Sequence, residues 1–395
     1  MRISTVGFQN DALAQMQALD ADIAQTQSEL STGLQLQNAA DNPSGMAQVN
    51  ELNVQLSASQ QYVTNGQAAT ANMTLEEQAL TQATTLLQSA QSLAVQANNT
   101  SLSSSERQNI AAQLQQQLQQ LVGIANSTDS NGNYLFGGYA SSAQPFAQSG
   151  NSVSYSGADA VDQIQISADQ RISGGDTGAS VFMNIPAGNG TFTTAAGSSN
   201  TGSASIDAGS VTNAAAWVPD TYSITFTSPT QYQVTNSADA VVASGTYSSP
   251  GTIAFDGVQV TVSGTPASGD TFSVTPAGTA SAFSSLSSLV TTLNSTTLNQ
   301  GQLTTQINGA LEQIGSAITN IDDVQASVGA RLDAISSSQS TSQSEQTDLQ
   351  TSISQLSDVD YAAAVTQLNT EEVSLQAAQE SYASLSKLSL FNYLS

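Results

Sequence analysis

The two ends of the chain carry matching heptad patterns of apolar residues, and this pairing constrains the fold more than any other feature. The apolar residues near the N-terminus follow a 3-4 spacing, and they are Met16, Leu19, Ile23 and Leu30, with Thr26 filling the remaining position of the stripe. A helix with such a narrow stripe and polar flanks gains too little burial to be stable alone. The pattern therefore predicts a helix over residues 10–37 that needs a partner helix.

The C-terminal stretch, residues 361–394, predicts that partner. Its stripe consists of Leu368, Leu375 and Tyr382 in one heptad row, Ala364, Ala378 and Leu385 in the other, and Leu388 beyond them. Glu371 is the one polar residue in this seam. Two interpretations follow, namely an ordinary intramolecular core or packing between subunits as well. We favour the second, because both stripes lie at the termini and neither is strongly apolar. The predicted assembly interface comprises Met16, Leu19, Ile23, Leu30, Leu368, Leu375, Tyr382, Leu385 and Leu388.

Composition excludes several classes of function. Five basic residues face thirty acidic ones, for a formal net charge of −25, so the chain repels nucleic-acid phosphates and anionic lipid headgroups. Cysteine and histidine are both absent, which removes disulfides, thiol nucleophiles, Ser-His-Asp triads and imidazole metal sites. We therefore expect no cofactor, no metal, no catalytic residues, no nucleic-acid partner and no membrane partner.

Helical periodicity continues inward from both ends. Pro43 forbids continuation of the first helix and suits the first turn of a second one, which the apolar spacing extends to about residue 95. Ser103 and Glu106 have the spacing of a capping box and predict the start of a third helix. Helical spacing returns at Phe283 and continues to the terminal helix.

Between the helices, from about residue 140 to residue 280, the periodicity changes from 3.6 to 2. Tyr222, Ile224 and Phe226 alternate with serine and threonine, which is typical of half-buried antiparallel strands. The predicted fold class is α+β, with a long helical bundle or coiled coil formed by both ends and a β-rich insertion. The predicted domains are residues 1–40 with 355–395 for assembly, 41–145 with 281–354 as a helical bundle, and 146–280 as a β-rich surface domain, either undivided or split into two subdomains near 188–202.

Three acidic or glycine-rich patterns invite a chemical interpretation but favour a structural one. The adjacent carboxylates of Asp322 and Asp323 do not face each other on a helix, so a solvated helix face is the better interpretation. The stretch 129–133 begins like a calcium loop, but Ala140 stands where the bidentate glutamate belongs, which favours a helix-ending turn. The glycine cluster 174–178 lacks a following helical pattern, so we expect a hairpin turn instead of a phosphate cradle.

Several motifs resemble those of the flagellin superfamily. The motifs are Leu30–Gly33, Ala40–Gly45 and Leu93–Ala97 in the N-terminal half and Val328–Leu332 in the C-terminal half. Within the superfamily, the start at Met1–Thr5, the turn Tyr134–Gly138 and the segments Leu375–Gln379 and Leu388–Leu394 are similar to hook-associated members more than to filament flagellins. The stretch Gly264–Phe272 is similar to a β motif in the surface domains of hook-associated proteins.

This resemblance implies a structural protein of the bacterial flagellum that polymerises through its terminal helices in the junction between hook and filament. It implies as partners other copies of the chain, hook-associated protein 1 on the hook side, flagellin and an export chaperone. The implied location is the extracellular flagellum, reached through the flagellar export apparatus without a cleavable signal peptide. A filament-forming flagellin is the alternative. A carbohydrate-binding protein or an enzyme that uses the insertion is a third possibility, for which no site residues stand out.

Overall fold

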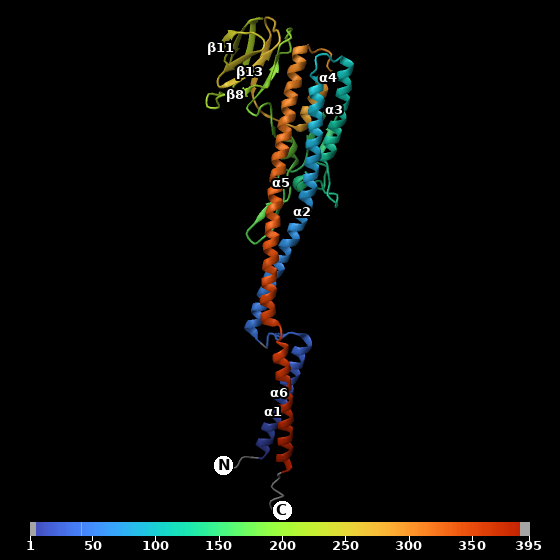
Figure 1. The fold of residues 1–395 in the computed structure, drawn as a ribbon, viewed down its shortest axis with the longest axis vertical. Coiled ribbons are helices and arrows are strands. Elements are labelled where there is room, and N and C mark those ends of the chain that lie inside the picture. Colours follow the sequence, from blue (N-terminus) through green and yellow to red (C-terminus); the bar gives the residue numbers. More distant parts are fainter. Residues whose placement is uncertain (1–4, 41, 388–395) are drawn as a thin grey trace, which may run out of the picture. The chain divides into compact units, whose positions relative to one another are not determined.

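The computed structural model describes residues 5–40 and 42–387, and it confirms the α+β fold class (Figure 1). Long helices formed by both ends of the chain enclose the strands in sequence. The helices are α1 (Thr5–Thr32), α2 (Pro43–Ala97), α3 (Ser104–Ala125), α4 (Ala282–Asn294), α5 (Gln300–Ser357) and α6 (Tyr361–Lys387). No helix in these two described ranges is long and apolar enough to cross a membrane.

The helix boundaries follow from local chemistry. The Ser103 hydroxyl accepts the Glu106 N–H while the Glu106 carboxylate accepts the Ser103 N–H, so the expected capping box opens α3. Pro43 is the first residue of α2, as expected. The first helix ends at Thr32 and not at residue 37, because Gly33 adopts a left-handed φ of 75° and turns the chain out of the helix.

The chain forms two compact units. Unit 1 comprises residues 1–64 and 338–395, and unit 2 comprises residues 65–337. The helices α2 and α5 each have one part of their length in unit 1 and the other part in unit 2. The boundaries expected from the sequence at residues 40 and 355 fall inside unit 1.

The helical core of unit 2 lies among α2, α3, α4 and α5 (Figure 1). Fully buried members include Leu80, Leu114 and Ile314. The same core contains Phe146 and Phe182, whose rings pack edge to face at 5.7 Å between centroids. The first part of the β-rich stretch, up to Ile185, therefore packs into the helical core instead of the core of the later strands.

The strands form small antiparallel sheets. They are β1 (Phe146–Ser149), β2 (Ser152–Tyr155), β3 (Gln163–Gln165), β4 (Arg171–Ser173), β5 (Ile185–Pro186), β6 (Phe192–Ala196), β7 (Ser205–Ile206), β8 (Ser210–Val211), β9 (Tyr222–Ser228), β10 (Gln231–Thr235), β11 (Val241–Thr246), β12 (Gly251–Phe255), β13 (Val258–Ser263), β14 (Thr271–Pro276) and β15 (Thr279–Ala280). One sheet has the order β11-β10-β9-β14-β6, and a second has the order β12-β13-β7, with β8 also pairing with β13.

The second core of unit 2 is built from the inward-facing residues of these two sheets, as in a β-sandwich. The alternation read from the sequence is confirmed, since Tyr222, Ile224 and Phe226 are buried while the residues between them are not. The strands that lead into and out of this β module lie side by side. β5 pairs with β15, and the Ala187 N–H donates to the Gly278 carbonyl at 2.9 Å.

Two turns were singled out in the sequence. Asp129 is confirmed in a turn after α3, where its Oδ1 accepts the backbone N–H groups of Asn131 and Asn133, each at 2.8 Å. The expectation of a hairpin turn at 174–178 is wrong. This segment leaves β4 and enters a short π-helix, Ala179–Met183, because Asp176 is bound between side chains of α2 and α5.

Candidate assembly interface

The predicted seam exists within unit 1, where α1 and α6 pack against each other (Figure 1). The predicted interface residues whose side chains are described are all half-buried, and they are Met16, Leu19, Ile23, Leu30, Leu368, Leu375 and Tyr382. Leu388 lies outside the described residues, and the side chain of Leu385 is not among those described. Half-burial means that two helices alone leave much of the seam exposed to solvent.

The two polar seam residues meet each other. The Thr26 hydroxyl, 3% exposed, lies 3.1 Å from Oε2 of Glu371 and 3.0 Å from the Asp22 carbonyl oxygen, and it can donate to either. The other carboxylate oxygen of Glu371 accepts the side-chain amide of Gln367 at 2.8 Å. A polar pair in an otherwise apolar seam favours one register of two helices, because an axial slip breaks the hydrogen bond between them.

The segments next to these helices are also joined. The Val359 N–H donates to the Gly33 carbonyl at 3.0 Å, and the Gln35 N–H donates to the Ser357 carbonyl at 2.7 Å. Asp360 caps α6, because its Oδ1 accepts the N–H groups of Ala362 and Ala363. The α1–α6 pair is therefore fastened at one end by backbone hydrogen bonds.

The glycine of the Ala40–Gly45 motif has a steric role. Asn42 caps α2, with its Oδ1 accepting the Gly45 N–H at 3.0 Å. A Cβ at Gly45 would lie 2.8 Å from the Asn42 amide nitrogen and 3.1 Å from Cδ1 of Leu36. A side chain at position 45 would therefore displace the Asn42 side chain that forms this cap.

Sequence reasoning missed a set of apolar residues beside the seam. Leu13 on α1 is 49% exposed, and Val365 on α6 is 47% exposed. The signal was available, since these residues extend the apolar stripe beyond the two heptad rows. Together with the half-buried seam, they leave apolar surface on the α1–α6 pair that a neighbouring molecule can cover.

A separate polar cluster lies inside unit 2. Glu76 of α2 is 2% exposed, and its Oε1 accepts the Asp176 N–H at 3.0 Å. Arg331 of α5 forms an ion pair with the Asp176 carboxylate and donates to the Gly175 carbonyl at 3.1 Å. Burial raises the pKa of Glu76 from 4.5 to about 8, the Asp176 charge adds to the increase, and Arg331 opposes it. The cluster ties α2 and α5 to the intervening loop.

Comparison with known proteins matches three parts of the chain to family models. Residues 3–141 match the bacterial flagellin N-terminal helical region, and residues 311–394 match the flagellin C-terminal helical region. Residues 195–276 match the D2-like domain of flagellar hook-associated protein 1. The crystal structure of FlgL from Xanthomonas campestris is 32% identical, with a TM-score of 0.71 over 78% of this chain and 99% of that one.

The chain belongs to the FlgL family of flagellar hook-associated proteins. Hook-associated protein 3 from Legionella pneumophila is another solved FlgL relative, 31% identical with a TM-score of 0.74 over 79% of this chain and 98% of that one. Among curated FlgL relatives, flagellar hook-associated protein 3 of Salmonella typhimurium is 34% identical over 185 residues, which is 47% of this chain and 58% of the relative. The chain thus matches little more than half the length of that relative. Its α1–α6 pair and its Ala40–Gly45 motif lie in the regions matched to the flagellin helices.

Proposed function

We propose that this chain is a structural subunit of the bacterial flagellum that polymerises through α1 and α6 to form the junction layer between hook and filament. The observation that carries the proposal is the apolar surface of the α1–α6 pair. Its seam residues are only half-buried within one chain, and Leu13 and Val365 are exposed beside them. Burying such a surface between subunits is favourable by roughly 25 cal/mol per Å² of apolar area.

The proposed interface comprises the nine seam residues named from the sequence, together with Leu13 and Val365. The proposed partners are other copies of the chain, hook-associated protein 1 on the hook side, flagellin on the filament side and an export chaperone before assembly. The proposed location is the extracellular flagellum, reached without a cleavable signal peptide through the flagellar export apparatus. A structural role requires no catalytic residue.

Deletion of the gene tests this proposal. Cells that lack the chain should build hooks but release flagellin into the medium as monomers, and the wild-type gene should restore attached filaments. Attached filaments in the deletion strain would refute a junction role. Long filaments formed by the purified chain alone would favour the flagellin alternative.

A pair of point variants tests the interface itself. Val365→Glu places a charge on the exposed apolar surface beside the seam, whereas Thr366→Glu places the same charge on the neighbouring exposed residue, which lies on the face of α6 opposite the seam. We expect both purified chains to melt as the wild type does, and only Val365→Glu to fail to restore filament attachment. Equal restoration by the two variants would exclude this surface from the assembly.

A further inference from the structure

Asparagine stands directly before glycine at four places in the sequence, which are Asn65–Gly66, Asn131–Gly132, Asn189–Gly190 and Asn308–Gly309. Asparagine is among the thermally labile residues of proteins. In an Asn-Gly pair the glycine nitrogen can attack the side-chain carbonyl carbon of the asparagine, because glycine has no Cβ to hinder the approach. The attack requires that backbone and side chain can move toward each other, so the surroundings of each pair decide whether it reacts.

The first pair lies inside α2, where the backbone is fixed. In a helix the glycine N–H is bonded to the carbonyl four residues earlier, and the helical dihedral angles keep it there. The Asn65 side chain is held as well, since its Nδ2 donates to the Gln165 carbonyl at 2.9 Å. Attack within this pair would require local unfolding of the helix.

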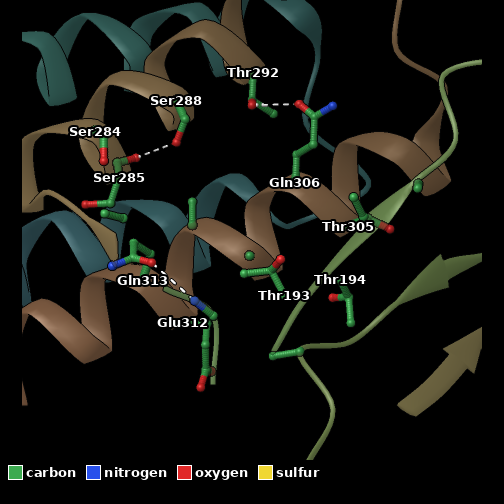
Figure 2. Close-up of a pocket in the computed structure, with 17 residues that line it drawn as sticks. Thr193, Thr194, Ser284, Ser285, Ser288, Thr292, Thr305, Gln306, Glu312 and Gln313 are labelled. Carbon is green, nitrogen blue, oxygen red and sulfur yellow. Dashed lines mark hydrogen bonds between the residues drawn. The ribbon is translucent and has the colours of Figure 1, made fainter. Parts of the chain in front are cut away.

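The pair in α5, Asn308–Gly309, is held in the same way. The Asn308 Oδ1 accepts the side-chain amide of Asn98 at 3.0 Å. Figure 2 shows Gln306 and Glu312, which α5 carries just before and just after this pair. The helix is continuous across the pair, so its glycine nitrogen is bonded within the helix and is not free to attack.

The pair Asn189–Gly190 lies in a turn, but its side chain is fixed at both ends. The Asn189 Oδ1 accepts the N–H groups of Thr191 and Phe192, at 3.0 and 2.9 Å. Its Nδ2 donates to the carbonyls of Ala208 and Gly209, at 3.1 and 3.2 Å. An amide whose oxygen and nitrogen are both bonded in this way cannot turn toward the glycine nitrogen without breaking these bonds.

The pair Asn131–Gly132 is held much less firmly. Both residues are exposed, in the turn that follows α3. The Gly132 N–H donates to the Asp129 carbonyl at 3.1 Å, and the Asn131 side chain interacts with the carboxylate of the same Asp129. Within the described part of the chain, the hydrogen bonds of Asn131 thus stay inside this exposed turn. The pair can therefore move without disturbing a helix or a core.

We propose that Asn131 is a site of spontaneous deamidation, and that the other three Asn-Gly pairs keep their amides in the folded chain. In the first step a bond forms between the Gly132 nitrogen and the Asn131 Cγ, and the bond from Cγ to Nδ2 breaks. The nitrogen leaves as ammonia, with the proton lost from the glycine nitrogen, and a cyclic succinimide remains. Water then adds to either carbonyl carbon of this ring and opens it to aspartate or isoaspartate. No oxidant or reductant takes part.

The product changes the turn in which it forms. Both products place a second negative charge beside Asp129, and isoaspartate also inserts a Cβ into the main chain at residue 131. The turn depends on close hydrogen bonds, since the Asp129 N–H donates to the Asn133 carbonyl at 2.8 Å and Oδ1 of Asp129 accepts the Asn133 N–H at 2.8 Å. Like charges repel, and an added main-chain atom shifts these groups, so deamidation should open the segment between α3 and the buried Phe136.

Peptide mass spectrometry of the full-length chain tests the site. The folded protein is incubated in mildly alkaline buffer made with water that carries a heavy oxygen isotope, which marks every ring that water has opened. We expect labelled aspartate and isoaspartate at position 131 to form about tenfold or more faster than at positions 65, 189 and 308, because a held pair reacts only while it is locally open. Equal rates at the four pairs, or faster reaction at another pair, would overturn the proposal.

The chain unfolded in urea is the matched control for the role of the structure. In urea the helices and turns no longer hold the other three pairs, so all four should react at comparable rates. A preference for position 131 that persisted in urea would show that the flanking sequence selects this pair, and it would refute the structural argument.

The variant Asn131→Gln tests the effect on the turn. Glutamine should remove the product, because attack on its longer side chain would have to close a larger ring, and its melting should match the wild type because residue 131 is exposed. During the same incubation, thermolysin should cut the wild type progressively faster between α3 and Phe136, and Asn131→Gln at a constant rate. An equal increase in both chains would refute the opening of the turn by deamidation.

Discussion

Glu76→Gln should abolish a pH dependence of stability that the wild-type chain has between pH 4.5 and 8. The wild-type carboxyl is buried beside Asp176, which raises its pKa to about 8 in the folded state. Below pH 4.5 the folded and unfolded states both hold the proton. As the pH rises above 4.5, the unfolded chain loses the proton while the folded chain keeps it, so the free energy of unfolding falls until about pH 8.

The expected magnitude follows from one proton. A difference of one bound proton changes the free energy of unfolding by about 1.4 kcal/mol per pH unit. Between pH 5 and pH 8 the wild type should therefore lose up to about 4 kcal/mol relative to Glu76→Gln. Glutamine keeps the shape and the contacts of the protonated acid. Its Oε1 can accept the Asp176 N–H, as Glu76 does at 3.0 Å, and its amide can donate to the Asp176 carboxylate.

Urea unfolding followed by helical circular dichroism at constant ionic strength measures this effect at pH 5, 6, 7 and 8. Glu77→Gln is the matched control, because it makes the same change at the neighbouring exposed residue. The difference between wild type and Glu76→Gln should grow with pH, whereas Glu77→Gln should parallel the wild type. Parallel pH profiles for all three chains would refute the assignment of a buried, protonated Glu76.

Three further predictions concern the fold. Residues 1–37 and 355–395 should be cut by thermolysin in the monomer and protected in the assembly. The reason is that burial of a half-exposed seam offsets little of the conformational entropy lost when these helices are ordered. Equal protection in both states would contradict this prediction. The double variant Thr26→Val with Glu371→Leu should slow that cleavage of the monomer, because it replaces a buried polar pair by apolar contact; faster cleavage would show that the pair stabilises the helices. Replacing residues 189–276 with a short Gly/Ser linker should leave the helical melting transition in place, because β5 and β15 already lie side by side. A replacement that begins at residue 146 should abolish that transition, because it removes Phe146 and Phe182 from the helical core.

The sequence by itself determined the elements and the interface candidates. Heptad spacing located the seam of α1 and α6, because a helical period places every third or fourth residue on one face whatever that face contacts. The capping box at Ser103 and the proline at 43 located helix starts, because these signals act within a few residues. Alternation of apolar residues identified β9 for the same local reason.

The tertiary structure decided what depends on residues far apart in the chain. Phe146 and Phe182 lie in a β-rich stretch but pack among the helices, and no local pattern distinguishes one apolar core from another. Glu76 looks like any helical glutamate until Asp176 and Arg331, which are a hundred or more residues away in the chain, surround it. The Gln313 side chain of α5 likewise accepts the Gly188 N–H, 125 residues away in the chain, only because the helix and that segment meet in space. Burial and hydrogen bonding are properties of the folded neighbourhood, so these groups could be recognised only there.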